Sequence, residues 1–340
     1  MKNKIRVLFI IALPFVLIGF NLIDLDKKIF QYPTSWPKPH YNFDNNPLNK
    51  VQIELGRKLF YDPILSANNT ISCSSCHLSY TAFTHVDHAL SHGINDSIGT
   101  RNSPVLINLA WNELFMWDGA VNNIEVQALA PISHPAEMGE EINHLIKKLQ
   151  KDKNYPLRFY KAYGDSLITS QHILKSIAQF QLTLVSANAK YDKVKRGDEE
   201  FNPQEFKGYE LFLKHCNGCH SEPLFTNGQL ASNGLSIDTN LKDVGRFAIT
   251  QANDDSLKFK IPTLRNIEFS QPYMHDGRLN SLSEVLKHYA SEISTSQNLK
   301  SDLKDNLPLS DKDRVDLVAF LLTLTDKEFL FNPNYSYPLQ

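Results

Sequence analysis

Two stretches, Cys73-Ser74-Ser75-Cys76-His77 and Cys216-Asn217-Gly218-Cys219-His220, share the pattern C-x-x-C-H, which is typical of covalent haem attachment. Two thiols one turn apart can form thioethers with the vinyl groups of a haem, and the adjacent His can bind the iron. The motifs use all four cysteines, so none is left for a disulfide. A zinc site would need both pairs to converge and would not need a His after each. The sequence therefore predicts two haem c groups, attached through Cys73, Cys76, Cys216 and Cys219, with His77 and His220 on the irons.

The composition is that of an ordinary globular protein. The chain has 340 residues, of which 42% are hydrophobic and 21% charged, a length that favours two domains. The formal net charge of −2 gives no indication of a nucleic-acid partner.

The first 25 residues form either a signal peptide or an N-terminal membrane anchor. A basic start, residues 1–6, precedes an apolar run over residues 7–20, which is the pattern of a secretory signal. The run is short for a transmembrane helix, but residues 18–21 offer no small-x-small cleavage site. Both alternatives predict export, and we expect the protein in the periplasm.

Short segments recur in the same order around the two haem motifs, which indicates a duplicated unit. The matching pairs are residues 56–60 with 208–212, 104–108 with 262–266, 115–119 with 273–277, and 180–184 with 320–324. We therefore predict a mainly all-α fold of two tandem cytochrome c-like haem domains, 47–194 and 201–326, with residues 195–200 between them. Strand signals are weak, residues 235–261 are expected as long loops, and the tail after residue 327 as an extended arm.

A glycine lies inside a predicted helix before each haem motif. Gly56 and Gly208 are unfavourable in a helix on propensity alone, so close packing against another helix is the expected reason for them. The spacing predicts two apolar stripes on these helices. The first comprises Leu48, Val51, Leu55 and Leu59, and the second Phe206, Tyr209 and Leu213.

Met274 is the predicted second axial ligand of the second haem, opposite His220. A thioether suits ferrous haem, and Met/His ligation raises the reduction potential. Pro272 and the Asp276-Gly277 turn favour a loop that points the sulfur at iron, although a Met can equally serve core packing. His275 is the alternative ligand.

The distal side of the first haem has several candidate residues: His85, His88, His92 and Met116. A catalytic haem needs a sixth position that is vacant or can be vacated, together with a nearby acid–base group. His92 precedes Gly93 in a loop that could swing on and off a metal. Glu125 is a candidate acid–base group, although by sequence alone an exposed helix glutamate is favoured.

Several linked segments carry a resemblance to a known family. They are Cys73 to His77 followed by Ala82-Phe83-Thr84, Ser91-His92-Gly93, Arg101-Asn102-Ser103-Pro104, Trp117-Asp118-Gly119, Gln127-Ala128 with Pro131 and Glu137-Met138, Cys216 to His220, Pro262-Thr263-Leu264-Arg265-Asn266, and Pro272-Tyr273-Met274-His275-Asp276-Gly277. In this order and spacing, over residues 47–326, they resemble the bacterial dihaem cytochrome c peroxidases and the related dihaem enzyme that matures methylamine dehydrogenase.

The resemblance implies a role for each haem. The first is the peroxidatic centre, where His92 matches a distal His that is released when the second haem is reduced. Glu125 matches a distal glutamate that assists cleavage of the O–O bond of hydrogen peroxide. The second haem, with His220 and Met274, receives electrons from a small donor, a cytochrome c or a cupredoxin.

The resemblance also implies an interdomain calcium ion at Asn102, for which Asp255 is a suggested further ligand. Homodimers are typical of the family. An aromatic relay between the haems is common in it, and Trp111 and Trp117 are both candidates.

The chain departs from the family around Met116. Where the family often has Gln-Phe-Trp-Asp-Gly-Arg, this chain has Phe115-Met116-Trp117-Asp118-Gly119-Ala120. If Met116 bound the first iron permanently, the protein would be a dihaem electron carrier without peroxidase activity. A third reading is oxidative maturation of a partner protein, but the maturation enzyme has Tyr where this chain has Met274.

Overall fold

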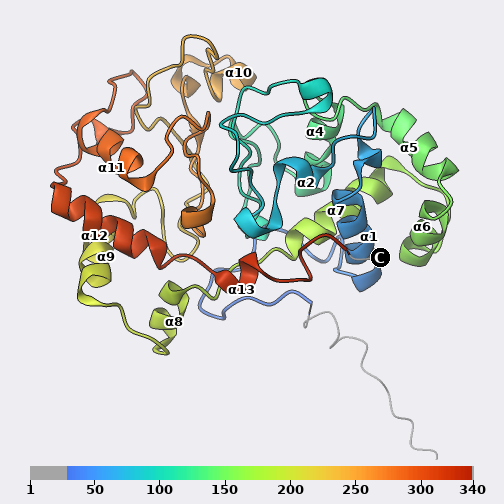
Figure 1. Cartoon of the computed structure of the whole chain (residues 1–340), viewed down its shortest axis with the longest axis horizontal. Helices are drawn as coiled ribbons and strands as arrows, with labels where there is room; N and C mark the ends of the chain where they lie inside the picture. The colour runs from blue at the N-terminus through green and yellow to red at the C-terminus, as the bar shows by residue number, and fades with distance from the viewer. Residues whose placement is uncertain (1–28, 339–340) are drawn as a thin grey trace, which may run out of the picture.

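The computed structural model describes residues 29–338, which form a mainly helical structure with long loops (Figure 1), and the mainly helical prediction is confirmed. The predicted signal or anchor, residues 1–25, lies outside the described residues. Within residues 29–338, no helix has the length and apolar character needed to span a membrane.

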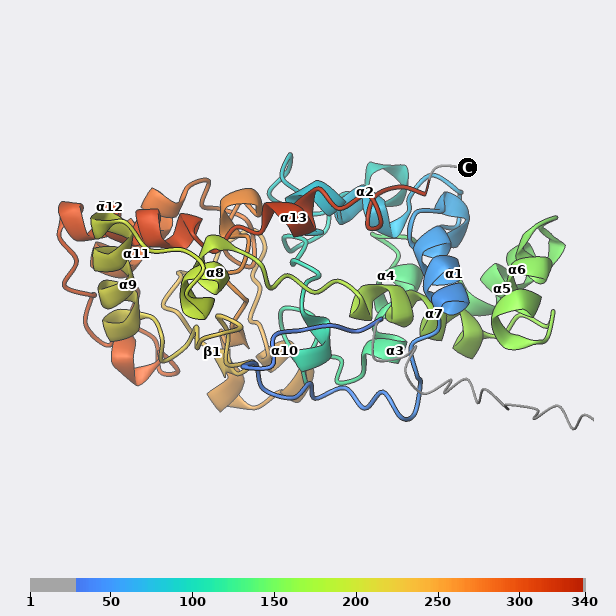
Figure 2. The same cartoon turned by 90° about the horizontal axis from the view of Figure 1, so that it is seen from below.

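The N-terminal and C-terminal halves of the chain lie side by side (Figures 1 and 2). The helices of the N-terminal half are α1 (Lys50–Phe60), α2 (Cys73–Cys76), α3 (Ile124–Gln127), α4 (Leu129–Ser133), α5 (Ile142–Lys151), α6 (Tyr155–Tyr163) and α7 (Ser170–Leu182), followed by α8 (Lys190–Arg196). The helices of the C-terminal half are α9 (Pro203–His215), α10 (Phe247–Thr250), α11 (Leu282–Ser291), α12 (Asp311–Leu322) and α13 (Lys327–Leu330). The strands β1 (Leu230–Ala231) and β2 (Phe259–Lys260) pair antiparallel, with Leu230 opposite Lys260.

The segment 235–261 is largely irregular, as expected. It contains only the single turn of α10, a 3₁₀ turn at Asn253–Asp255 and the two residues of β2.

Each half is built on one close pair of helices, α1 with α7 and α9 with α12. A Cβ atom at Gly56 would lie 1.8 Å from the carbonyl oxygen of Ser176, and one at Gly208 would lie 1.9 Å from that of Asp316. Both distances are far below van der Waals contact, so only glycine allows the helices to approach this closely. The prediction that these glycines serve close packing is confirmed.

The predicted apolar stripes were only partly correct. On α1, Leu55 and Leu59 are buried, but Val51 is 41% exposed. On α9, Phe206 and Leu213 are 53% and 41% exposed, and the residues that α9 buries are Gly208 and Phe212. The stripe predicted for α9 was therefore correct only at Tyr209, whose ring packs on Phe320 of α12 at 5.2 Å. The face that carries Gly208 turns toward α12 and leaves Phe206 and Leu213 outside.

The two halves end their long helices in the same way. The hydroxyl of Thr183 donates to the carbonyl of Phe180 after α7, and that of Thr323 to the carbonyl of Phe320 after α12. This agrees with the predicted helix ends.

Two buried asparagines at matching repeat positions form hydrogen bonds with the segments that follow these helices. Asn108 and Asn266 both have left-handed backbone conformations, with φ of 54° and 58°, which Asn tolerates better than most residues. The amide of Asn108 donates to the carbonyl of Leu184, and that of Asn266 to the carbonyl of Leu324. The Asn108 side chain accepts from the amide of Ser186, and the Asn266 side chain from that of Asp326.

The segments that follow α7 and α12 meet at Asp326. One oxygen of its carboxylate accepts hydrogen bonds from the amides of Ala187 (3.0 Å) and Asn188 (2.9 Å), while Asn266 donates to the hydroxyl of Ser186. The junction between the two halves is thus a buried set of hydrogen bonds.

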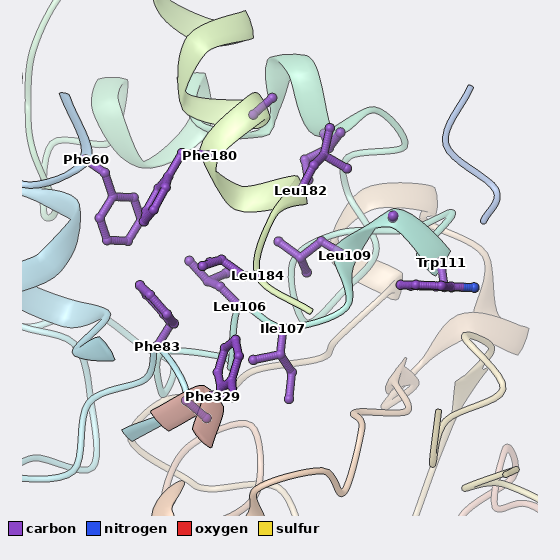
Figure 3. Close-up of a cluster of buried hydrophobic side chains, with 14 of the residues drawn as sticks. Phe60, Phe83, Leu106, Ile107, Leu109, Trp111, Phe180, Leu182, Leu184 and Phe329 are labelled. Carbon is purple, nitrogen blue, oxygen red and sulfur yellow. The ribbon is translucent and has the colours of Figure 1, made fainter. Parts of the chain in front are cut away.

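An aromatic and aliphatic core fills the N-terminal half (Figure 3). Phe60 from α1, Phe83 from the loop after the first haem motif and Phe180 from α7 meet with ring centroids 5.3 to 6.2 Å apart. Phe329 from α13 packs on Phe83 at 6.1 Å. The end of the chain therefore contributes to the core of the N-terminal half.

The tail after α12 continues over the N-terminal half, in agreement with the expected arm, although it contains the short helix α13. Arg57 on α1 donates to the carbonyl of Ser336, and the hydroxyl of Tyr61 donates to the carbonyl of Tyr335. The hydroxyl of Tyr335 in turn donates to the carbonyl of Thr183.

Residues 29–47, which we name the N-terminal strap, form an extended loop that reaches toward the C-terminal half and returns to α1 (Figure 2). At its far end the ring of Trp36 lies under the guanidinium of Arg265, whose Cζ is 4.6 Å from the ring centroid. On its return, the amide of Tyr41 donates to the carbonyl of Ala110.

Gly208→Ala should lower the free energy of unfolding. Helix propensity alone would favour alanine by about 1 kcal/mol, but the new methyl group must push α9 from α12, which costs about 1–3 kcal/mol or more. Chemical denaturation of the holoprotein measures the net sign. Phe206→Ala, on the exposed side of α9, is the control and should change stability little; an equally stable G208A would contradict the packing argument.

Candidate haem sites

The first haem motif begins the short helix α2. The amide of Ser72 donates to the hydroxyl of Ser75, and the amide of His77 donates to the carbonyl of Cys73. Cys73 and Cys76 are free thiols on this turn. The loop that follows returns through an antiparallel bridge between Leu78 and Thr84.

His77 is oriented by the loop after it. Its Nδ1 lies 2.7 Å from the carbonyl oxygen of Phe83, which suits an Nδ1–H donor and leaves Nε2 as a ligand. Burial lowers the pKa of His77 to about 4, so the ring is neutral at pH 7 and its Nε2 can bind a metal.

The second motif starts at the C-terminal end of α9 and has the same design. Cys216 and Cys219 are free thiols, and His220 Nδ1 lies 3.2 Å from the carbonyl oxygen of Phe225 and 3.1 Å from that of Pro262. Burial lowers the pKa of His220 to about 4. Both motifs therefore offer two thiols and a neutral, oriented imidazole, which is the donor set that a haem c requires.

Met274 and Met116 have the same local structure. Met274 has φ of 76°, and an antiparallel bridge between Tyr273 and Leu279 encloses it; Met116 has φ of 67° within a bridge between Phe115 and Val121. The equivalence read from the repeat thus extends to the backbone. Positive φ is uncommon for a residue such as Met, so each turn presents its Met side chain in a specific direction.

Each of these sulfurs accepts a hydrogen bond from a side-chain amide. Gln127 Nε2 donates to Met116 Sδ at 3.4 Å, and Asn233 Nδ2 donates to Met274 Sδ at 3.4 Å. The sequence analysis gave neither amide a role. Gln127 belongs to a segment quoted for the family resemblance, whereas Asn233 has no counterpart in the repeat that could have identified it.

His92 lies in a segment that is anchored on both sides. It forms an antiparallel bridge with Ile98, and a Cβ at Gly93 would lie 2.2 Å from the carbonyl oxygen of Ala136. The loop expected to swing is therefore packed, and any movement of His92 falls mainly on its side chain. The ring points to Asp96, 3.1 Å from Nδ1, and packs on His88 at a centroid distance of 4.3 Å.

The other histidine of this region, His85, stacks on His88 with centroids 5.1 Å apart. The three rings form a row, but no group of three or more His, Cys, Asp or Glu residues in the described chain is arranged to hold a metal ion.

Glu125 lies in the first turn of α3, where its amide donates to the side chain of the N-cap residue Asn123. Its carboxyl group is held from two sides. The hydroxyl of Tyr41 donates to Oε1 at 2.6 Å, and the ammonium of Lys175 on α7 lies 3.9 Å from Oε2. The side chain of Glu125 is only 18% exposed, unlike the solvent-facing helix glutamate that the sequence alone favoured.

Asn102 and Trp117 lie where the two halves meet. The Trp117 indole donates to the backbone carbonyl of Asn102. The backbone amide of Asn102 donates to the carbonyl of His275. The carbonyl of Trp117 accepts from the amide of Lys260. Trp111 lies instead in the core of the N-terminal half, so Trp117 is the better placed of the two relay candidates.

The predicted calcium ion at Asn102 stays a prediction. The Asn102 side chain donates to the carbonyl of Ala89, which leaves its amide oxygen as a possible ligand. The suggested partner Asp255 is engaged elsewhere: the Thr250 hydroxyl donates to it, and Lys258 lies 3.8 Å away.

Arg101 joins the halves through a charged fork. Its Nε and Nη2 donate to the two oxygens of Asp243, and its Nη1 donates to Asp118. All three side chains are mostly buried. Burial acts to raise the pKa of Asp243, but the hydrogen bonds and charge of Arg101 outweigh it and hold that pKa below its usual value.

Comparison with known proteins agrees with this arrangement. The family model for di-haem cytochrome c peroxidase matches residues 50–200. The methylamine utilization protein MauG of Methylorubrum extorquens is 35% identical over 88% of this chain and 84% of its own length. The chain belongs to the di-haem cytochrome c peroxidase and MauG family.

Other relatives cover the chain to a similar extent. The cytochrome c551 peroxidase of Nitrosomonas europaea is 33% identical over 86% of this chain and 84% of its own length. Among solved structures, a MauG-like protein associated with microbial copper homeostasis superposes with a TM-score of 0.82, at 30% identity over 92% of this chain and 99% of that one.

Membership of this di-haem family implies two haem c groups and a redox function for the protein. The four cysteines and two histidines described above fit those groups. The family includes both peroxidases and MauG proteins, so the reaction itself is taken up below.

Asp243→Asn should reduce stability by about 1–3 kcal/mol at neutral pH. Because Arg101 lowers the Asp243 pKa, this stabilisation is fully present above the pKa of an unfolded Asp, about 4, and is lost as pH falls through the folded value. The difference between wild type and D243N should therefore be constant from about pH 7 to 5 and shrink below about pH 4.

Denaturation at several pH values measures this difference. Asp198→Asn is the control, since Asp198 pairs with Arg196 on the surface and should contribute little. A pH-independent difference would contradict the assigned ion pair.

Proposed function

We propose that the protein is an exported, periplasmic dihaem peroxidase that reduces hydrogen peroxide to water. The reaction consumes one peroxide, two electrons and two protons and gives two waters. A small redox protein, a cytochrome c or a cupredoxin, supplies the electrons. In this proposal residues 47–194 form the peroxidatic haem domain and residues 201–326 the electron-transfer haem domain, both cytochrome c-like.

The observation that carries the proposal is the carboxyl group of Glu125. It lies in the half that contains the first haem motif and is largely screened from solvent. One oxygen accepts a hydrogen bond from Tyr41, and the ammonium of Lys175 lies 3.9 Å from the other. A carboxyl group held in this way can accept a proton from one peroxide oxygen and return it to the other, which is general acid–base catalysis.

The remaining predicted residues hold and tune the two centres. Bound haem supplies the redox-active iron; His77 holds the first group, and His220 with Met274 holds the second. Their orienting carbonyls fix the imidazoles. His92 is the proposed side-chain cap on the distal side, and its contacts with Asp96 and His88 would hold the ring once it has turned away.

An electron-transfer protein without peroxidase activity is the second candidate. The identical turns around Met116 and Met274 favour it, because a sulfur that bound the first iron as Met274 is proposed to bind the second would close the distal site. Gln127 donates to the Met116 sulfur just as Asn233 donates to the Met274 sulfur, so these bonds do not separate the two functions. Glu125 argues against the electron carrier, which has no use for a carboxyl group held in this way.

Oxidative maturation of a partner protein is a third possibility within the family. The similarity to MauG proteins is what supports this alternative. The maturation enzyme that the chain resembles has Tyr at the position of Met274, so a thioether here argues for electron transfer through the second haem.

Mixing half-reduced protein, with the second haem ferrous and the first ferric, with hydrogen peroxide in a stopped-flow spectrometer tests the proposal. We expect a fast change in the spectrum of the first haem together with oxidation of the second. A first haem that stays low-spin and does not react would favour the electron carrier. Slow turnover with small donors but rapid change of a protein substrate would favour maturation.

Glu125→Gln should lower peroxide turnover by roughly 10²- to 10⁴-fold, because the proton relay is lost. The spectra of both haems should be unchanged, since Glu125 holds neither iron. Glu113→Gln, on an exposed glutamate of the same half, is the control and should turn over like wild type. Full activity in E125Q would remove Glu125 from the mechanism.

A further inference from the structure

We propose that Tyr41, carried by the N-terminal strap, is a positioning residue for Glu125. Its hydroxyl holds Oε1 so that the carboxyl group keeps one orientation while it takes and returns a proton. This inference rests on the proposed role of Glu125. It assigns a function to a segment that precedes the first haem motif and that the sequence analysis left without one.

The contact is a short, specific hydrogen bond. The phenol oxygen of Tyr41 lies 2.6 Å from Glu125 Oε1, across 84 positions of sequence. Burial and the neighbouring Glu125 both raise the pKa of Tyr41, so the phenol keeps its proton throughout the neutral range and remains a donor.

A buried amide network fixes the phenol. Asn46 Nδ2 donates to the Tyr41 hydroxyl at 3.1 Å, and Gln179 Nε2 donates to Asn46 Oδ1 at 2.9 Å. Gln179 is fully buried on α7 and also lies 2.7 Å from Gln52 Oε1 on α1. The orientation of Tyr41 is therefore set by the same two helices that position the first haem motif.

The strap also fixes Tyr41 by packing. Its ring meets Phe43 edge-on at 4.9 Å, and Phe43 packs on Phe30 at 4.5 Å. With the backbone bond to Ala110, these contacts leave the hydroxyl little freedom, so the bond to Glu125 costs little further ordering.

A cavity of about 430 Å³ adjoins the network on its outer side. Its lining includes Asn46, the donor to Tyr41, and Lys175, the cation beside Glu125. Tyr41 and Glu125 themselves do not line the cavity; it reaches only the residues that contact them.

Tyr41→Phe removes only the hydroxyl. The test is the rate at which cyanide binds the first haem of half-reduced holoprotein, measured across pH, because hydrogen cyanide must give its proton to a distal base. We expect Y41F to bind cyanide roughly 10- to 100-fold more slowly and with a shifted pH profile, the size expected for losing a hydrogen bond to a charged group. E125Q should be at least as slow.

The double variant decides whether Tyr41 acts through Glu125. Y41F should have no further effect in the E125Q background, because the two residues form one unit. Tyr335→Phe is the matched control, since it also loses a hydroxyl that donates within this half, to the carbonyl of Thr183, and it should bind cyanide like wild type.

The outcomes separate the two proposals. Wild-type cyanide kinetics and pH profile in Y41F, with E125Q slow, would overturn the role of Tyr41 alone. Additive effects in the double variant would also overturn it, since Tyr41 would then act independently. Wild-type kinetics in E125Q would overturn the role of Glu125 and that of Tyr41 with it. A lower unfolding free energy in Y41F with unchanged cyanide kinetics would leave Tyr41 a structural role only.

Discussion

The contact between a glycine and a helix carbonyl is the constraint on which each half of the molecule depends. Gly56 faces Ser176, and Gly208 faces Asp316, at distances that exclude any side chain. This approach fixes α1 against α7 and α9 against α12, and each haem motif follows the first helix of its pair. Core residues such as Phe60 and Phe212 can then fill the space beside the crossing. A shift of either pair would move the thiols and the imidazole together.

The two haem sites share this helix packing and differ mainly in the side chains beside the methionine. Met116 and Met274 have equivalent turns and equivalent amide donors, so ligand geometry does not distinguish the sites. The difference is Glu125, which has a hydroxyl donor and a nearby cation but no counterpart among the residues described around Met274. If the first site is catalytic, its chemistry comes from this acid–base group and from the strap that holds it.

Local patterns predicted much of the fold. Features that depend on a short segment could be read from that segment alone. They are the haem motifs, the role of the two glycines, the ends of α7 and α12, and the equivalence of Met116 with Met274. The buried face of α9 was predicted only in part, because apolar spacing selected Phe206 and Leu213 along with Tyr209, whereas the glycine determines which face meets α12. The partners of Glu125 could not be predicted at all: Tyr41 is 84 positions away in a segment without periodicity. The fork from Arg101 to Asp243 joins residues 142 positions apart, and the family motif around Arg101 does not indicate its partner.

The tail that follows α12 also bears on the order in which the molecule can be assembled. Arg57, Tyr61 and Phe83 belong to the N-terminal half, yet their partners Ser336, Tyr335 and Phe329 follow α12 in the sequence. Domains generally fold in the order of their synthesis, but here the N-terminal half takes part of its core from a segment that follows α12. The core around Phe83, which lies in the loop after the first haem motif, therefore reaches its described form only once the second motif has also been made.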